Sequence, residues 1–168
     1  MNTDKNLNLE AWKIPSNNFD HNKMLQFSIT AIQDFAANHQ EEVFYGFSID
    51  ATMLCLNSEQ KFSESLAHYQ SEDLEYYSDA EEIQNLRINT GDWWLGDWEY
   101  QGFADIEDSG GFDSEAYDEH YQASDEAQKY TPYGLAMDNL IAELSTRDAF
   151  LPLRRTSDFF VNRVEHNY

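Results

Sequence analysis

The sequence predicts a single α+β domain, in which a central, mostly antiparallel sheet is flanked by helices. Hydrophobic residues make up 41% of the 168 positions and aromatic residues 15%, which is enough apolar material for a buried core. Short apolar runs at residues 43–49 and 53–56 have the composition of paired strands. Apolar residues at helical spacing come before and after these runs. We therefore assign residues 1–20 to a polar N-terminal arm and residues 21–168 to the domain.

The first expected element is a helix that begins at His21. Asp20 is its expected N-cap, because a carboxylate accepts hydrogen bonds from the free amides of a first helical turn. The polar stretch at residues 38–41 is expected to end the helix. Its apolar face holds Leu25, Ile29, Ile32 and Phe35.

A strand pair is expected after this helix. The run at residues 43–49 is rich in aromatic and β-branched residues, which favour strands. The run at residues 53–56 is its expected partner, and Asp50, Ala51 and Thr52 form the connection. A connection this short predicts an antiparallel hairpin.

Two helices are predicted next. Asn57 and Gln60 stand three residues apart, as in a capping box at the head of a helix. Ser78 and Glu81 have the same spacing at the head of a second, shorter helix. Residues 71–77 between the two helices are acidic, and we expect them to form an exposed connection.

The segment at residues 88–103 reads INTGDWWLGDWEYQGF and repeats Gly-Asp-Trp after five residues. The two Gly-Asp turns predict a turn–strand–turn unit or a wide bulged loop. We expect Trp93, Trp94 and Trp98 either to fill the core or to form an aromatic contact surface. Tryptophan buries a large area in cores and is also enriched among the residues that contribute most to binding at interfaces. We expect at least two of the three in the core.

The C-terminal part is predicted to contain two helices and a strand. Residues 104–130 contain nine acidic residues, and residues 113–128 within this stretch are predicted as an acidic helix. Thr131 and Pro132 predict the start of another helix, because a hydroxyl N-cap is followed by proline at the first helical position. Residues 159–164 are apolar enough to form the last strand of the sheet.

The middle of the chain carries most of the net charge of −22. Nineteen of the 32 acidic residues lie at positions 64–126, where Arg87 is the one basic residue. Such a domain repels nucleic acid and anionic membranes and attracts basic partners. The acidic region is thus either a solvated face or a partner surface. No signal-like segment and no run near the roughly 20 apolar residues of a membrane span occurs, so we expect a cytoplasmic protein.

The sequence contains no catalytic or metal-binding motif. Cys55 is the single cysteine, which excludes an intramolecular disulfide and a cysteine-based zinc cluster. An apparent calcium loop starting at Asp105 fails, because Ala116 stands at the twelfth position, where a bidentate glutamate is required. The phosphate-loop, dinucleotide-binding and nucleophile-elbow motifs are absent as well. The sequence therefore predicts no cofactor, no bound metal and no catalytic residue.

Several stretches together resemble an uncharacterised bacterial family, domain of unknown function 4303. They read VFYGFSID at 43–50, LCLNSE at 54–59, LRINTGDW at 86–93 and WEYQGF at 98–103. The resemblance covers roughly residues 21–165, and the second Gly-Asp-Trp is a short insertion relative to the family. It implies a small cytosolic α+β protein of the kind found beside polymorphic toxins, where immunity proteins are frequent. It implies no catalytic residue.

Charge and resemblance together favour an immunity protein that binds and neutralises a bacterial toxin domain. Many such toxins are nucleases, whose basic clefts hold phosphates and attract an acidic inhibitor. The alternatives are an acidic protein-binding module without a toxin partner and a carboxylate-based or metal-dependent hydrolase. The predicted partner-binding carboxylates are Asp105, Glu107, Asp108, Asp113, Glu115, Asp118 and Glu119, joined by the acidic end of the 71–82 segment. The predicted apolar anchors are Tyr117, Tyr121 and one exposed tryptophan, for which we name Trp94.

Overall fold

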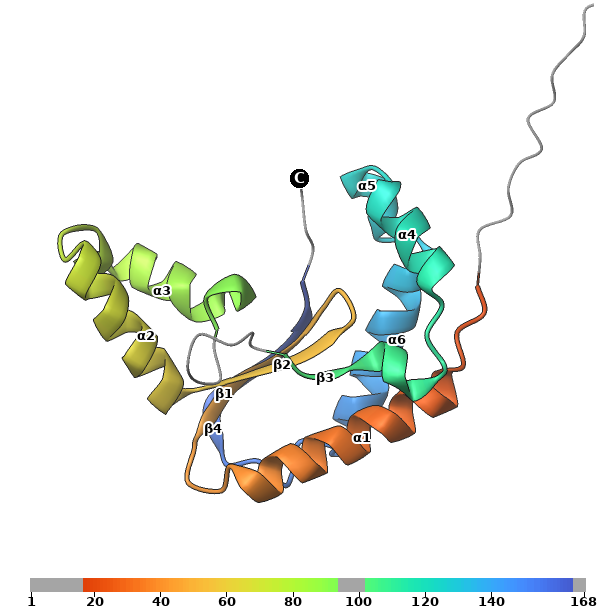
Figure 1. The fold of residues 1–168 in the computed structure, drawn as a ribbon, viewed down its shortest axis with the longest axis horizontal. Coiled ribbons are helices and arrows are strands. Elements are labelled where there is room, and N and C mark those ends of the chain that lie inside the picture. Colours follow the sequence, from red (N-terminus) through yellow and green to blue (C-terminus); the bar gives the residue numbers. More distant parts are fainter. Residues whose placement is uncertain (1–16, 94–101, 165–168) are drawn as a thin grey trace, which may run out of the picture.

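A four-stranded mixed sheet lies between two layers of helices in the computed structural model, which describes residues 17–93 and 102–164 (Figure 1). One layer contains helices α1 (His21–Asn38) and α6 (Pro132–Thr146). The other contains α2 (Glu59–Glu72) and α3 (Ala80–Ile88). This arrangement confirms the expected α+β class, with a sheet flanked by helices.

The strands of the sheet are arranged in the order β3-β2-β1-β4. The hairpin of β1 (Phe44–Asp50) and β2 (Met53–Ser58) is antiparallel, as predicted. Strand β3 (Gly102–Asp105) pairs antiparallel with β2, whereas β4 (Arg155–Arg163) pairs parallel with β1. The sheet is thus mostly antiparallel, as predicted. Its last strand begins at Arg155, four residues before the apolar run at residues 159–164 from which it was predicted.

Side chains that alternate along the hairpin divide the interior into two cores. Leu54 and Leu56 face α1 and α6, where they join the larger core of the molecule. Cys55, between them, faces α2 and α3. There it belongs to a smaller core whose buried members are Tyr45, Cys55, Phe62, Leu86 and Trp93.

A bulge at Gly46 interrupts the alternation in β1. The pairing register shifts between Phe44 and Gly46, both toward β2 and toward β4. The ring of Phe160 lies directly over Gly46, so that a Cβ atom there would come within 2.5 Å of the ring. Glycine is required at this position, because the aromatic ring occupies the space of a side chain.

The helices of the larger core begin where the sequence predicts. The Asp20 carboxylate accepts a hydrogen bond from the Lys23 amide at 3.1 Å and caps α1. The Thr131 hydroxyl accepts one from the Gly134 amide at 3.1 Å and caps α6, with Pro132 at the first helical position. Both predicted caps are confirmed.

The predicted caps of α2 and α3 are each wrong by one residue. Ser58, and not Asn57, caps α2, because the Asn57 side chain donates to the Tyr45 hydroxyl in the smaller core. Asp79, and not Ser78, caps α3, because the Ser78 hydroxyl donates to a carbonyl of the preceding turn. Asn57 and Ser78, which the capping-box spacing indicated as caps, therefore make other hydrogen bonds, and the next residue caps each helix.

The acidic region 104–130 forms several short elements instead of one long helix. A 3₁₀ turn, Ile106–Ser109, follows β3 and ends at Gly110, whose φ of +65° lies in the left-handed region. Helix α4 (Ser114–Gln122) and the single turn α5 (Asp125–Gln128) come next. The break at Ala123 and Ser124, which are both extended, corrects the predicted helix at residues 113–128.

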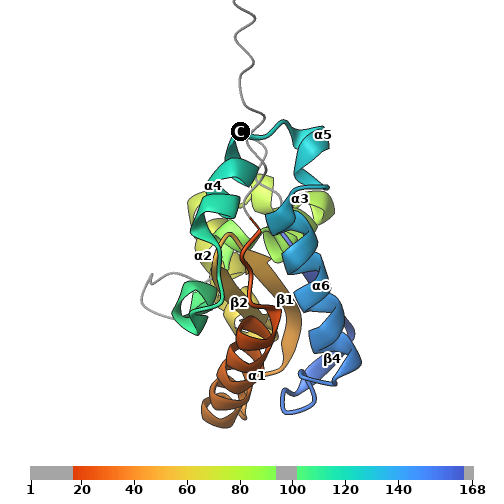
Figure 2. The same cartoon turned by 90° about the vertical axis from the view of Figure 1, so that its right-hand side faces the viewer.

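The two acidic parts of the chain project from opposite ends of the molecule. Figure 1 shows the α2–α3 pair at one end of the sheet and α4, α5 and the start of α6 at the other. The view in Figure 2 shows that α1 and α6 lie side by side along one face. The sheet therefore lies between the two acidic projections.

Candidate partner-binding surface

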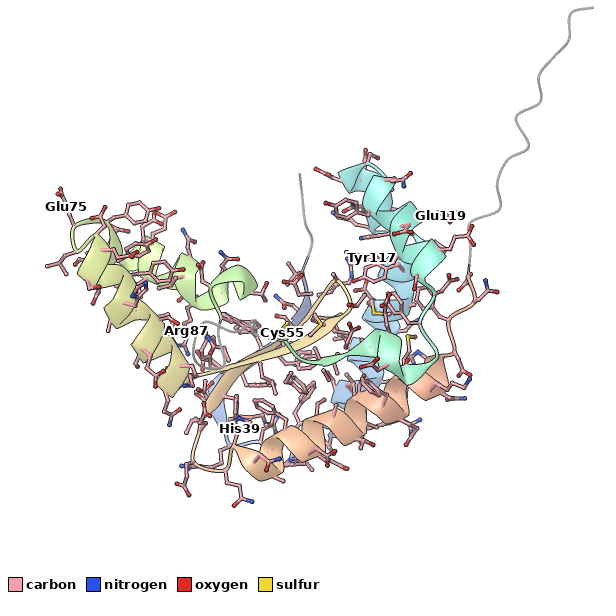
Figure 3. All side chains as sticks on the ribbon, viewed as in Figure 1. His39, Cys55, Glu75, Arg87, Tyr117 and Glu119 are labelled. Atoms are coloured by element: carbon pink, nitrogen blue, oxygen red, sulfur yellow. The ribbon has the colours of Figure 1, made fainter. Side chains whose placement is uncertain are left out.

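The predicted binding carboxylates of α4 lie at the surface. Glu115 and Asp118 are exposed, and Glu119 is half-buried. Asp125 and Glu126 continue the same charge along α5, where both are exposed. In Figure 3 the Glu119 side chain extends outward from α4, away from the sheet. We call these five residues the α4–α5 acidic surface.

Three further predicted carboxylates lie before α4 and have mixed roles. Asp105 ends β3, and its carboxylate accepts the Glu107 amide at 3.0 Å. Glu107 is exposed and accepts the Ser114 hydroxyl at 3.0 Å, which ties the 3₁₀ turn to the first residue of α4. Asp108 is exposed. Glu107 and Asp108 can therefore extend the α4–α5 acidic surface, whereas Asp105 shapes the turn.

Asp113 is a structural residue and not a surface one. Its side chain is 8% exposed, and one oxygen caps α4 by accepting the Ala116 amide at 3.1 Å. The other oxygen accepts the Asn18 amide at 2.7 Å. Two backbone amides donate to this carboxylate. Because it is also buried, Asp113 is not available for the partner binding that the sequence suggested.

The two predicted tyrosine anchors differ in position. Tyr117 points inward in Figure 3 and packs edge-to-face on Tyr133, with ring centroids 4.9 Å apart. It is half-buried at the margin of the larger core. Tyr121, one turn further on, is 52% exposed and lies beside Tyr117. Tyr121 is therefore the aromatic residue that α4 offers to a partner.

Of the three tryptophans in the 88–103 segment, the structure describes Trp93. Trp93 is buried, packs against Tyr45 and Phe160, and donates its indole N–H to the Arg87 carbonyl at 2.8 Å. It is a core residue, as expected of at least two of the three. Trp94 and Trp98 lie outside the described residues, as does the predicted strand between the two Gly-Asp turns.

A second acidic projection, the α2–α3 tip, was only partly predicted from the sequence. It consists of residues 72–82, which include Glu72, Asp73, Glu75, Glu81 and Glu82. Leu74 is 65% exposed at its centre, and Tyr76 beside it is half-exposed. Figure 3 shows Glu75 pointing away from the body of the molecule. The sequence analysis did not identify Leu74 as a surface residue, although a single leucine within an acidic run is a recognisable signal.

Hydrogen bonds order the α2–α3 tip. The Asp73 carboxylate accepts the Tyr76 amide at 3.0 Å, and Gln70 donates to the Tyr77 carbonyl at 2.8 Å. A hydrogen bond from the Tyr76 hydroxyl to Glu82 raises the pKa of that phenol to about 12. The tip therefore presents its leucine and tyrosine from a defined loop.

Arg87 faces inward and leaves the acidic region without its one basic side chain. Its guanidinium binds both carboxylate oxygens of Glu59, one of them at 2.9 Å. It also lies over the Tyr45 ring at 3.9 Å, and the hydrogen bond to Glu59 raises the pKa of Arg87. Among the described residues, the ion pair of Arg87 is thus made with Glu59, which lies outside residues 64–126.

Two reactive side chains, Cys55 and His120, are buried in the fold. Cys55 is fully buried in the smaller core, and burial raises the pKa of its thiol, which disfavours the nucleophilic thiolate. His120 is buried as well, with Nδ1 2.6 Å from the Thr131 hydroxyl. Within residues 17–93 and 102–164, no three His, Cys, Asp or Glu side chains are grouped closely enough to hold a metal ion.

Comparisons with known proteins give no relative from which a role could be transferred. No protein-family model, no curated protein and no solved structure matches the chain. Among the helices that the structure describes, none combines the length and the apolar character needed to cross a bilayer.

Proposed function

We propose that the protein is an immunity-type inhibitor that binds and neutralises a basic toxin domain, most simply a nuclease, in the cytoplasm. The observation that carries the proposal is the position of Arg87. The basic residue of the 64–126 stretch is turned toward Glu59 and the smaller core, while carboxylates stand on the exposed faces of α4, α5 and the α2–α3 tip. A basic cleft that evolved to hold phosphates would be attracted to such a surface at long range.

The two projections also provide apolar contacts within the acidic field. These are Tyr121 on α4, and Leu74 and Tyr76 on the α2–α3 tip, whose exposed fractions are 52%, 65% and 49%. Aromatic anchors such as tyrosine supply much of the affinity at protein interfaces, and charge mainly raises the association rate. The combination suits a tight inhibitor better than a purely solubilising coat.

Co-expression with the protein encoded by the gene immediately upstream tests the proposed function. We expect the neighbouring protein to stop growth when it is expressed alone, and this protein to restore growth. We further expect the two to co-purify at low salt and to separate progressively as the salt concentration rises, because screening weakens steering and surface attraction. A neighbour that is harmless, or that fails to bind at any salt, would contradict the proposal. A salt-sensitive complex without toxicity would favour the binding module instead.

A further inference from the structure

A small pocket lies beside the α2–α3 tip, between the 3₁₀ turn Tyr76–Ser78 and helix α3, at the end of the molecule opposite α4 (Figure 1). Its volume is about 200 Å³. This is less than the roughly 300–1,000 Å³ of sites for drug-sized ligands, so it suits a single side chain. We call it the α3 pocket. The polar and aromatic residues that line it are Tyr76, Tyr77, Glu82, Asn85, Asn89 and Asp92.

Helix α3 supplies one wall of the α3 pocket through a regular spacing. Glu82, Asn85 and Asn89 are separated by three and four residues, and this spacing places them on one face of the helix and its C-cap. Asp92 comes from the 3₁₀ turn Thr90–Asp92 that follows. The wall is therefore polar and rich in oxygen acceptors.

Two half-buried carboxylates line the α3 pocket, those of Glu82 and Asp92, and none of the described lining residues is basic. The ion pairs found within residues 17–93 and 102–164 include neither carboxylate. Arg87, although it belongs to α3, binds Glu59 instead and does not line the pocket. Because a carboxylate partly removed from water is costly until a cation approaches it, the pocket favours a cationic ligand.

Neutral donors hold both carboxylates in place and leave acceptor positions open. Asp92 accepts the Tyr69 hydroxyl and the Asn89 side-chain amide, both at 2.6 Å. Glu82 accepts the Tyr76 hydroxyl. Since a carboxylate has about four acceptor positions, each can accept further N–H donors. The carboxylates are also oriented before a ligand arrives, which reduces the entropy lost on binding.

Tyrosine rings form the other wall of the α3 pocket. The Tyr77 ring packs edge-to-face on Tyr76 with centroids 4.9 Å apart, and it lies 5.0 Å from the Tyr69 ring. Aromatic faces attract cations, and a planar guanidinium can stack on a ring while its N–H groups bind carboxylates. A lysine ammonium lacks this planar fork of donors. Rings and paired carboxylates together therefore favour arginine over lysine.

We propose that the α3 pocket binds the guanidinium group of one arginine side chain of the basic partner. The guanidinium donates to Glu82 and Asp92 and stacks against the tyrosine rings. This inference rests on the proposed function, because it names the side chain by which the same partner binds beside the α2–α3 tip. It also distinguishes the pocket from the α4–α5 acidic surface, where exposed carboxylates attract either kind of cation.

Three small probes test the inference on the full-length protein: the N-acetyl amides of arginine, lysine and citrulline. Citrulline is the neutral analogue of arginine and has nearly the same shape. NMR titration follows the side-chain amide signals of Asn85 and Asn89 and the ring signals of Tyr77. We expect the arginine probe to shift them saturably and to bind at least about fivefold more tightly than the lysine probe. The citrulline probe should shift none of them.

Equal binding of the arginine and lysine probes would overturn the inference, because charge alone would then explain it. Shifts by the arginine probe that are confined to α4 and α5, or no response to any probe, would overturn it as well.

Two pairs of variants provide the matched controls. Asn85→Arg places a guanidinium in the pocket from its own wall, and Gln84→Arg makes the same charge change at an exposed position outside it. We expect Asn85→Arg to weaken binding of the arginine probe at least about tenfold, and Gln84→Arg to stay within about twofold of the wild type. Glu82→Gln should likewise weaken binding more than Glu81→Gln, which removes an exposed charge outside the pocket. Equal effects within each pair would overturn the inference.

The probes separate failure of this inference from failure of the proposed function, because they require no toxin. Growth rescue by a protein whose pocket does not respond to arginine would overturn the inference and leave the proposed function standing. A selective response to arginine together with a harmless upstream-encoded protein would support the guanidinium site and contradict the proposed function. If both hold, Asn85→Arg should also weaken the complex with the upstream-encoded protein more than Gln84→Arg does.

Discussion

The two acidic projections have similar surfaces but different support. Asp113 accepts two backbone amides and anchors α4 to residues 17–20, the N-terminal strap, and Tyr117 packs against Tyr133 at the margin of the larger core. The α2–α3 pair rests on the smaller core, in which Trp93 is the largest buried side chain. The α4 end is therefore attached at the margin of the larger core through a buried capping carboxylate, whereas the α2–α3 end rests on the separate, smaller aromatic core. The first three variants below should separate these two kinds of support.

Trp93→Ala should cause the largest loss of stability. It removes the largest side chain of the smaller core together with the indole hydrogen bond to the Arg87 carbonyl. We expect the free energy of unfolding to fall by about 3–5 kcal/mol, as for other large-to-small changes in cores. Urea unfolding measures the loss, and hydrogen exchange locates it. Amide protection should fall in α2 and α3 first, and an equal fall in α4 would show that the projections are not independently supported.

Arg87→Ala should cause the next largest effect. The guanidinium connects Glu59 to the Tyr45 and Phe62 rings, but Glu59 is partly exposed, so solvent screening reduces the value of the ion pair. We expect a loss of about 2 kcal/mol, which includes the packing of the arginine stem. Arg87→Lys is the matched control, because it keeps the charge and loses the two-pronged hydrogen bonds. Equal stability of Arg87→Lys and the wild type would contradict the importance of that geometry.

Asp113→Ala should destabilise the other projection by about 1–2 kcal/mol. The substitution removes the cap of α4 and leaves the Asn18 amide without its acceptor. Asp79→Ala, which removes the exposed cap of α3, is the matched comparison and should cost about 1 kcal/mol. Hydrogen exchange should show loss of protection in α4 and in the strap together. Loss in α4 alone would mean that Asp113 does not couple the two segments.

The smallest expected effect concerns the Tyr76 hydroxyl of the α2–α3 tip. Its hydrogen bond to Glu82 raises the pKa of the folded phenol to about 12, above the ordinary value of 10.0. The neutral phenol is therefore favoured in the folded protein, and this small stabilisation is complete below pH 10 and lost as the pH rises toward 12. Glu82→Gln should return the pKa of Tyr76 toward 10, as followed by NMR titration of labelled tyrosine. An unchanged pKa in the variant would contradict the hydrogen bond.

The sequence pattern correctly predicted elements whose apolar side chains repeat regularly. It did not predict features that depend on contacts between residues far apart in the chain. The stripe of α1, the hairpin and the Thr131-Pro132 start of α6 could all be found from the sequence, because each depends on neighbouring residues. The parallel pairing of β4 with β1 could not, since it joins residues more than 100 positions apart. The same holds for Asp113, which reads as a surface carboxylate until the strap brings the Asn18 amide to it. Leu74, in contrast, could have been identified from the sequence, because it is a single leucine within an acidic run.

On the proposed function, the acidic residues of the α4–α5 acidic surface, and not net charge alone, bind a basic toxin. The most direct test measures the affinity for the upstream-encoded protein at low and high salt in two double variants. Glu115→Lys/Asp118→Lys reverses charge on α4, and Asp34→Lys/Glu41→Lys makes the same change in net charge at exposed positions in α1 and just beyond it. At low salt, we expect the first variant to bind at least tenfold more weakly, or about 1.4 kcal/mol, and the second to remain within twofold of the wild type. Equal weakening by the two variants, or no weakening by either, would contradict the claim.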